Sequence, residues 1–189
     1  MKFVGALMFL LFLSSGVFAQ EKQADQKQPS TELEAFLQTK GQIIVKEFHA
    51  ISAISGQYGT RLTIGTLVLY EPNNPEKKKR GLRIEVQGGG RAEREHTSFL
   101  DLDEIEALSK GIAYMTLLAN DWQGKNREYS EVVLSTKGDF RVGFYTSDGK
   151  LSAFAKSGHI GSVDAILSME SLQLLKTAAD RGMEYLNGK

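Results

Sequence analysis

The sequence predicts an α+β fold built from two ββββα repeats, in which each antiparallel sheet is followed by an amphipathic helix. The first observation is a pair of similar helix starts, "FLDLDEIEALSKGI" beginning at Phe99 and "AILSMESLQLLKTA" beginning at Ala165. The second is that four short segments rich in Ile, Val, Leu and Thr precede each helix start. The third is the frequency of turn residues between these segments, with 19 Gly against only three Pro in the chain.

The first 19 residues predict a secretory signal peptide. Lys2 supplies a positive charge, an apolar run spans residues 3–13, and small residues precede a cleavage point before Gln20. A membrane anchor is the alternative interpretation. However, Ser and Gly at positions 14–16 interrupt the apolar run before it reaches the length of about 20 residues that a spanning helix requires. The absence of Cys favours a bacterial envelope over a disulfide-rich exterior. We therefore expect a secreted or periplasmic protein without a stable membrane anchor after cleavage.

The chain after the cleavage point predicts a spacer and one domain. Residues 20–30 are polar and free of aromatic side chains, which is typical of a disordered segment. Residues 31–189 form the predicted single α+β domain. It opens with Thr31 and Glu34 in the spacing of a capping box, so a short helix is expected before Gly41.

Two sets of four alternating segments define the predicted sheets. Leu82, Ile84 and Val86 share one face of their segment and polar residues share the other, as in a half-buried antiparallel strand. Asp148 and Gly149 suit a tight hairpin turn. The predicted strands are residues 42–55, 60–71, 80–88 and 93–100 in the first repeat (about 41–119), and 129–138, 139–149, 150–158 and 162–167 in the second (about 128–187).

The two helix starts can be aligned residue by residue. In both, a residue suited to N-capping follows a Leu, and an apolar residue stands four positions after the cap. The Leu before the cap can pack on that apolar residue as a hydrophobic staple. We interpret the repeated order of four strands, staple and helix as an internal duplication. The aligned pairs are Leu100/Leu167, Asp101/Ser168, Ile105/Leu172 and Leu108/Leu175.

This repeated order, with its two staples, resembles the single-stranded-DNA-binding fold family that includes the Whirly proteins and the small transcriptional positive cofactors. The resemblance covers about residues 41–186. It implies two sheet-and-helix units, which Whirly proteins carry in one chain and the cofactors assemble from two chains. The chain lacks a Whirly-type "KGKAAL" stretch in its first half, so the resemblance bears on the fold more than on DNA binding.

The composition excludes several classes of site. Lys+Arg and Asp+Glu are balanced at 23 each, so the net charge favours neither a nucleic acid nor an acidic membrane. Without Cys there is no disulfide, thiolate metal site or cysteine nucleophile. The sequence contains no G-x-S-x-G or H-E-x-x-H motif. We therefore expect a protein that is not an enzyme and that holds no cofactor.

The second predicted sheet carries the main candidate binding residues. Alternation places Arg141 and Tyr145 opposite the apolar face of their strand, and it places Phe154 and Lys156 opposite the apolar face of the next. A sheet face with Arg, Lys and aromatic side chains can bind a single-stranded nucleic acid or another polyanion. The alternative, which we favour, is that Tyr145 and Phe154 are covered by the first repeat or by a second chain.

A second candidate is the basic run in "NNPEKKKRG", which joins two predicted strands. Lys77, Lys78, Lys79 and Arg80 can contact phosphates or an anionic surface. A solvated hairpin tip is the alternative that we favour, because charged residues are also common in exposed turns.

Three other patterns predict structure rather than a ligand site. "QGGGRAERE" opens no helix, so a flexible hairpin loop is expected there instead of a phosphate cradle. The three histidines lie far apart in the sequence and predict no metal site. Asp101, Asp103 and Glu104 suit helix capping and the dipole of the first turn, so they are not assigned as metal ligands.

Two classes of function remain. We favour an exported, non-enzymatic binding or interaction protein that contacts an unidentified protein partner or a second copy of the chain. The alternative is a module that binds a polyanion or single-stranded nucleic acid through the basic and aromatic sheet face. The affinity for a polyanion should fall steeply with salt, because binding to phosphates releases counterions.

Overall fold

A computed structural model describes residues 28–90, 94–125 and 127–189 of the chain. The predicted signal peptide (1–19) and residues 20–27 of the predicted spacer lie outside the described residues, as does the centre of the glycine-rich loop at 91–93. None of the helices in the described ranges combines the length and the apolar character that a membrane span requires.

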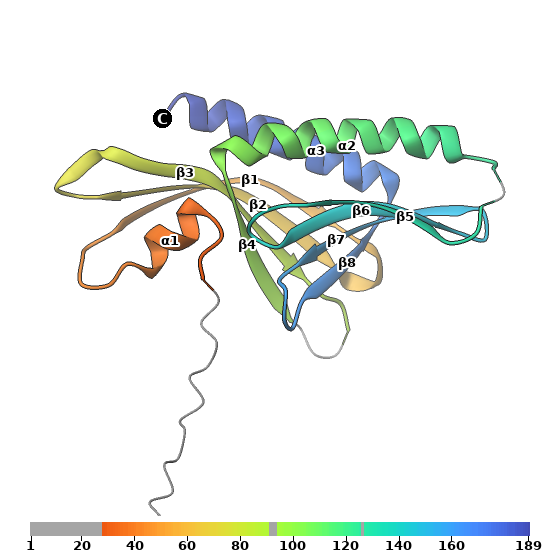
Figure 1. Ribbon diagram of the computed structural model, residues 1–189, viewed down its shortest axis with the longest axis horizontal. Helices are drawn as coiled ribbons and strands as arrows, with labels where there is room; N and C mark the ends of the chain where they lie inside the picture. Colours follow the sequence, from red (N-terminus) through yellow and green to blue (C-terminus); the bar gives the residue numbers. More distant parts are fainter. Residues whose placement is uncertain (1–27, 91–93, 126) are drawn as a thin grey trace, which may run out of the picture.

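The described chain forms two ββββα units, which confirms the predicted fold class (Figure 1). In each antiparallel sheet the strands lie in sequence order, and one long helix follows the last strand. The first unit consists of β1 (Val45–Ser55), β2 (Arg61–Glu71), β3 (Asn74–Gln87), β4 (Glu95–Asp101) and α2 (Leu102–Trp122), with the 3-10 turn η1 (Gln57–Gly59) after β1. The second unit consists of β5 (Ser130–Ser135), β6 (Phe140–Ser147), β7 (Lys150–Ser157), β8 (Val163–Leu167) and α3 (Met169–Asn187).

The register of the strands is equivalent in the two sheets. Each sheet has a glycine on its second strand that pairs with an outward-facing residue of the third strand. Gly65 pairs with Arg83 in the first sheet, and Gly143 pairs with Phe154 in the second. In each sheet, the residue just before Arg83 or Phe154 on the third strand pairs with the Leu that precedes the helix cap. The repeat therefore extends from the order of the elements to individual cross-strand pairs.

The two long helices lie side by side against the inner faces of the sheets (Figure 1). Hydrogen bonds join Ser109 to Asp180 and Gln173 to Thr116, so α2 and α3 run antiparallel to one another. A single cluster of buried apolar residues contains side chains from both sheets and both helices. The two repeats therefore share one hydrophobic core, whose burial supplies the main driving force for folding.

Both long helices begin at the predicted caps. The Ser168 hydroxyl accepts a hydrogen bond from the Ser171 amide at 3.1 Å, and the Glu104 carboxylate accepts one from the Asp101 amide at 3.1 Å. In each repeat the Leu before the cap and the apolar residue four positions after it are fully buried. The predicted staple positions therefore lie inside the shared core.

A short helix, α1 (Glu32–Gln38), covers part of the outer face of the first sheet, which is the face opposite α2 and α3. Thr31 and Glu34 form its predicted capping box. Leu33 is fully buried in a small cluster with Leu67 of β2, and the partly buried Phe99 of β4 packs against this cluster. In the described part of the chain no helix covers the matching face of the second sheet.

The prediction of a hairpin tip for the basic run was wrong. The run lies inside β3, where Lys79 pairs with Leu69 and Arg80 pairs with Val68. The turn falls earlier, at Pro72 and Asn73, because these residues favour turns whereas the apolar end of β2 continues to pair. The basic side chains therefore lie along a hairpin arm.

Candidate functional site

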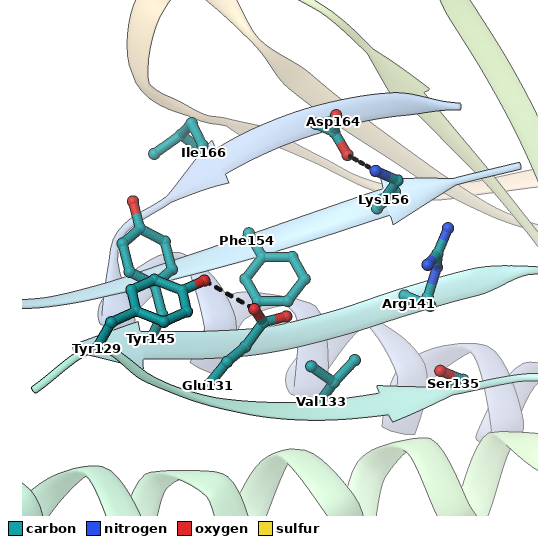
Figure 2. A pocket seen from close by; sticks show the side chains of 10 residues that line it. All are labelled: Tyr129, Glu131, Val133, Ser135, Arg141, Tyr145, Phe154, Lys156, Asp164 and Ile166. Carbon is teal, nitrogen blue, oxygen red and sulfur yellow. Dashed lines mark hydrogen bonds and ion pairs between the residues drawn. The ribbon is translucent and has the colours of Figure 1, made fainter. Parts of the chain in front are cut away.

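The main candidate site is the outer face of the second sheet, on the side away from both long helices (Figure 2). We call this face the outer platform. It contains a shallow hollow of about 470 Å³. The residues that line it are Tyr129, Glu131, Val133, Ser135, Arg141, Tyr145, Phe154, Lys156, Asp164 and Ile166.

Strand alternation places the predicted binding residues on this platform. The apolar residues of β6 and the two alanines of β7 at 153 and 155 are fully buried toward the helices. Arg141, Tyr145, Phe154 and Lys156 therefore point to the opposite face, and all four line the hollow, as expected. The structure thus brings together half of the predicted binding residues.

An apolar row crosses the centre of the platform at right angles to the strands. Val133, Gly143, Phe154 and Ile166 follow one another through direct cross-strand pairs from β5 to β8. The Phe154 ring lies over Gly143, because a Cβ atom at Gly143 would be only 3.0 Å from two carbons of that ring. Because Gly143 has no side chain, the Phe154 ring can lie close to the backbone of the sheet.

Two tyrosines extend the aromatic surface toward one end of the strands. The ring centres of Tyr129 and Tyr145 are 5.9 Å apart, and those of Tyr145 and Phe154 are 6.4 Å apart. Tyr129 was not assigned to the site from the sequence, although it opens the predicted strand 129–138; in the structure it lies one residue before β5. The alternation of Tyr129, Glu131 and Val133 was the signal that could have included it.

The charges on the platform are balanced, with two acids and two bases among the lining residues. Lys156 forms an ion pair with Asp164 at 3.1 Å across β7 and β8. Arg141 donates a hydrogen bond to the Gly158 carbonyl at 3.3 Å. Tyr129 donates a hydrogen bond of 2.8 Å to Glu131, and this bond to a carboxylate raises the pKa of the tyrosine.

The expectation that the first repeat covers Tyr145 and Phe154 was wrong. Both side chains are only partly buried, and every residue that lines the hollow belongs to the second repeat. The core of the molecule lies on the other face of the sheet, so the first repeat packs there instead. Cover by a second chain, the other part of the expectation, stays a prediction.

The basic run lies away from the outer platform and does not form one site with it. Lys79 pairs with Glu32 of α1 at 2.7 Å, and Arg80 donates a hydrogen bond to the Leu186 carbonyl at 3.1 Å. The Lys78 ammonium group lies 5.7 Å from the centre of the Tyr70 ring. Lys77 is exposed.

The acids at the start of α2 have structural partners. Asp101, Asp103 and Glu104 place carboxylate oxygens within 4.8 Å of one another, the one group of this kind found in the described residues. Asp103 pairs with the Lys137 side chain at 2.8 Å, and Glu104 accepts a hydrogen bond from the Lys137 amide at 2.8 Å. Asp101 accepts hydrogen bonds from amides at the start of α1. Helix capping and ion pairs therefore account for these side chains.

The histidines occupy separate structural positions. His49 stacks on Tyr185 of α3 with ring centres 4.1 Å apart. His96 bonds to the Ser157 hydroxyl at 2.8 Å, which links the two sheets. His159 is exposed after β7. Within the described ranges, no histidine joins a group of three side chains that could bind a metal ion.

Comparison with known proteins identifies no relative. No family model matches the chain, and no curated protein or solved structure matches it. The two sheet-and-helix units expected from the Whirly-like resemblance are present, but membership of that family stays a prediction.

Proposed function

We propose that this protein is an exported, non-enzymatic binding protein whose outer platform contacts a protein partner. The observation that carries the proposal is an aromatic, partly exposed sheet face that no other part of the described chain covers. An apolar sheet face that is left open loses the stabilisation that burial against another layer supplies. A partner chain would provide that layer.

The chemistry of the platform resembles that of protein interfaces. Such interfaces have an apolar centre rich in Tyr, Phe and Arg, with polar groups around it. Here Phe154 lies in the central apolar row with Tyr145 next to it, and Arg141 and Glu131 lie on the two sides of that row. Aromatic and Arg side chains in such positions commonly supply most of the binding free energy.

A capture experiment with matched bait proteins tests this proposal. The baits are the wild-type chain, Phe154→Ala, and Phe48→Ala as the control, because Phe48 is a 63% exposed phenylalanine on the outer face of the first sheet. We expect wild type and Phe48→Ala to retain the same proteins from an envelope extract, and Phe154→Ala to lose them. A set of proteins that all three baits retain equally would contradict a role for the platform.

Export is tested separately by N-terminal sequencing of the native protein. The predicted signal peptide places the mature start near Gln20. An intact Met1 in a membrane fraction would show that the first segment is an anchor.

Polyanion binding is a second candidate function, favoured by Arg141 and Lys156 on the same face as the aromatic rings. Two acids offset these bases, which favours the protein partner over this candidate. A titration with a single-stranded oligonucleotide at two salt concentrations separates the two functions. Polyanion binding predicts an affinity that falls steeply with salt and is lost in Arg141→Ala.

A further inference from the structure

The outer platform is the uncovered counterpart of a face that the chain covers in its first repeat. There, α1 packs over Leu67 and Phe99 on the outer side of the sheet. The cross-strand pairs place Tyr145 and Ile166 at the equivalent positions of the second sheet. Both are partly exposed and line the platform. The second sheet therefore has an apolar outer face like that of the first, but it lacks the cover.

The charged groups of the platform lie on the two sides of the apolar row. On one side, Arg141, Lys156 and Asp164 follow one another through direct cross-strand pairs. On the other side, Glu131 of β5 pairs with Tyr145 of β6 (Figure 2). One side therefore carries two bases and one acid, and the other carries one acid. The charges of the face are therefore complementary to those of a second copy that is turned over about the apolar row, because the basic side of one copy then lies against the acidic side of the other.

We infer that the outer platform binds the outer platform of a second copy of this chain, related by a twofold axis along the apolar row. The inference rests on the proposed function and names its partner. Rotation about this axis places each strand over the same strand of the other copy and reverses its direction. The side with Arg141 and Lys156 then faces the side with Glu131 and Tyr145 of the second copy.

This arrangement brings specific groups together. Arg141 lies opposite Tyr145 of the second copy, where the guanidinium group can contact the ring face. Glu131 of the second copy is one strand further, about 4.8 Å along the row, within reach of a long arginine side chain. Phe154 lies near the axis and faces Phe154 of the second copy. Each pair off the axis occurs twice, because a twofold interface uses the same patch on both chains.

The size of the face predicts a weak, concentration-dependent dimer. The sheet has four strands of five to eight residues. At about 4.8 Å between strands and 3.3 Å per residue, its flat area is roughly 300–500 Å² per copy. Two such faces fall below the roughly 1,200–2,000 Å² of stable interfaces. The dimer should therefore dissociate on dilution.

Analytical ultracentrifugation over a range of concentrations tests the inference directly. We expect wild type to pass from monomer to dimer between micromolar and millimolar concentration. Phe154→Asp should remain monomeric, because it places charge at the axis. Arg141→Glu and Glu131→Arg should each weaken the dimer at least tenfold through like-charge contacts, and the double variant should recover most of the affinity. Arg181→Glu is the control, because Arg181 is exposed on α3, on the other side of the second sheet, and the substitution makes the same change of charge as Arg141→Glu.

Every outcome of these measurements either supports the inferred dimer or overturns it. Thermal melting of every variant at low concentration separates a lost dimer from a lost fold. A wild-type chain that stays monomeric at millimolar concentration would overturn the second copy as partner, as would a dimer that Phe154→Asp leaves intact. Failure of the double variant to recover would overturn the proposed axis. If the chain is monomeric but the capture of proteins still depends on Phe154, the proposed function stands and only this inference fails.

Discussion

The carboxylate of Asp101 accepts a hydrogen bond from the backbone amide of Glu32 at 2.8 Å, across 69 residues of sequence. Its second oxygen accepts from the Leu33 amide at 3.2 Å. Asp101 is only 6% exposed, and it is also the N-cap residue of α2. One side chain therefore fixes the first turn of α1 to the start of α2, where a negative charge also suits the dipoles of both helices.

Replacement of Asp101 should destabilise the protein more than replacement of the equivalent cap in the second repeat. Asp101→Ala leaves two amides of α1 without a charged acceptor and should lower the free energy of unfolding by about 2–3 kcal/mol. Ser168→Ala loses one capping bond and should cost about 1 kcal/mol. Urea unfolding of both variants measures the difference. Equal losses would mean that the bonds to α1 contribute little to stability.

The matched core positions of the two long helices give a second prediction. Ile105 and Leu172 are both fully buried at equivalent places after the caps. Ile105→Ala and Leu172→Ala should each lower the free energy of unfolding by about 2–5 kcal/mol, through lost burial and the cavity left behind. Glu106→Ala, at an exposed neighbouring position, is the control. Because both repeats share one core, each core variant should unfold in a single transition, and two separate transitions would contradict the shared core.

The hydrogen bond between Ser109 and Asp180 predicts a contribution to stability that is lost in acid. Burial by itself would raise the pKa of Asp180, but hydrogen bonds from Lys176 and Ser109 outweigh it and hold the pKa below its ordinary value. A carboxyl group with a lowered folded-state pKa stabilises the protein above its unfolded pKa. That stabilisation disappears as the pH falls through the folded pKa.

Asp180→Asn should therefore lower the melting temperature at neutral pH and make less difference at strongly acidic pH. The effect should be modest, because 48% of the Asp180 side chain is exposed and solvent weakens its ion pair with Lys176. Melting curves of wild type and Asp180→Asn across this pH range measure it. A constant difference at every pH would show that the charge of Asp180 is not responsible.

The sequence was sufficient for the order of the elements because their signals are local. Alternating polarity marks the strands, and the caps at Asp101 and Ser168 mark the helix starts. The same alternation placed Phe154 and Lys156 on one face of the second sheet. These features depend on neighbouring residues, so no tertiary contact is needed to predict them.

Features that depend on distant segments could not be predicted in this way. Nothing near Asp101 indicates that its carboxylate binds amides at the start of α1. The pairing of Lys79 with Leu69 depends on where the β2–β3 turn forms, and the basic composition of the run suggested the wrong place. Whether Phe154 is covered depends on which face of its sheet packs against the rest of the molecule. The alternation of residues along a strand shows which side chains share a face, but it does not show which face is covered.

The equivalent glycines of the two sheets provide a final prediction. A Cβ atom at Gly143 would overlap the Val132 carbonyl oxygen and lie 3.0 Å from the Phe154 ring, whereas its nearest neighbour at Gly65 would be the His49 carbonyl oxygen at 3.0 Å. Gly143→Ala must therefore move both a strand and the ring, and it should lower the free energy of unfolding by about 1–3 kcal/mol, as other overpacked sites do. Gly65→Ala requires a smaller shift and should cost less. It is therefore the matched control at the same place in the repeat.

Gly143→Ala should also change the outer platform, because the Phe154 ring can no longer lie low on the sheet. We expect weaker self-association in Gly143→Ala and unchanged self-association in Gly65→Ala. Urea unfolding and ultracentrifugation of the same two proteins measure the two effects separately. If Gly143→Ala were as stable as Gly65→Ala and associated like wild type, the close contact between Gly143 and Phe154 would have no role in either stability or binding.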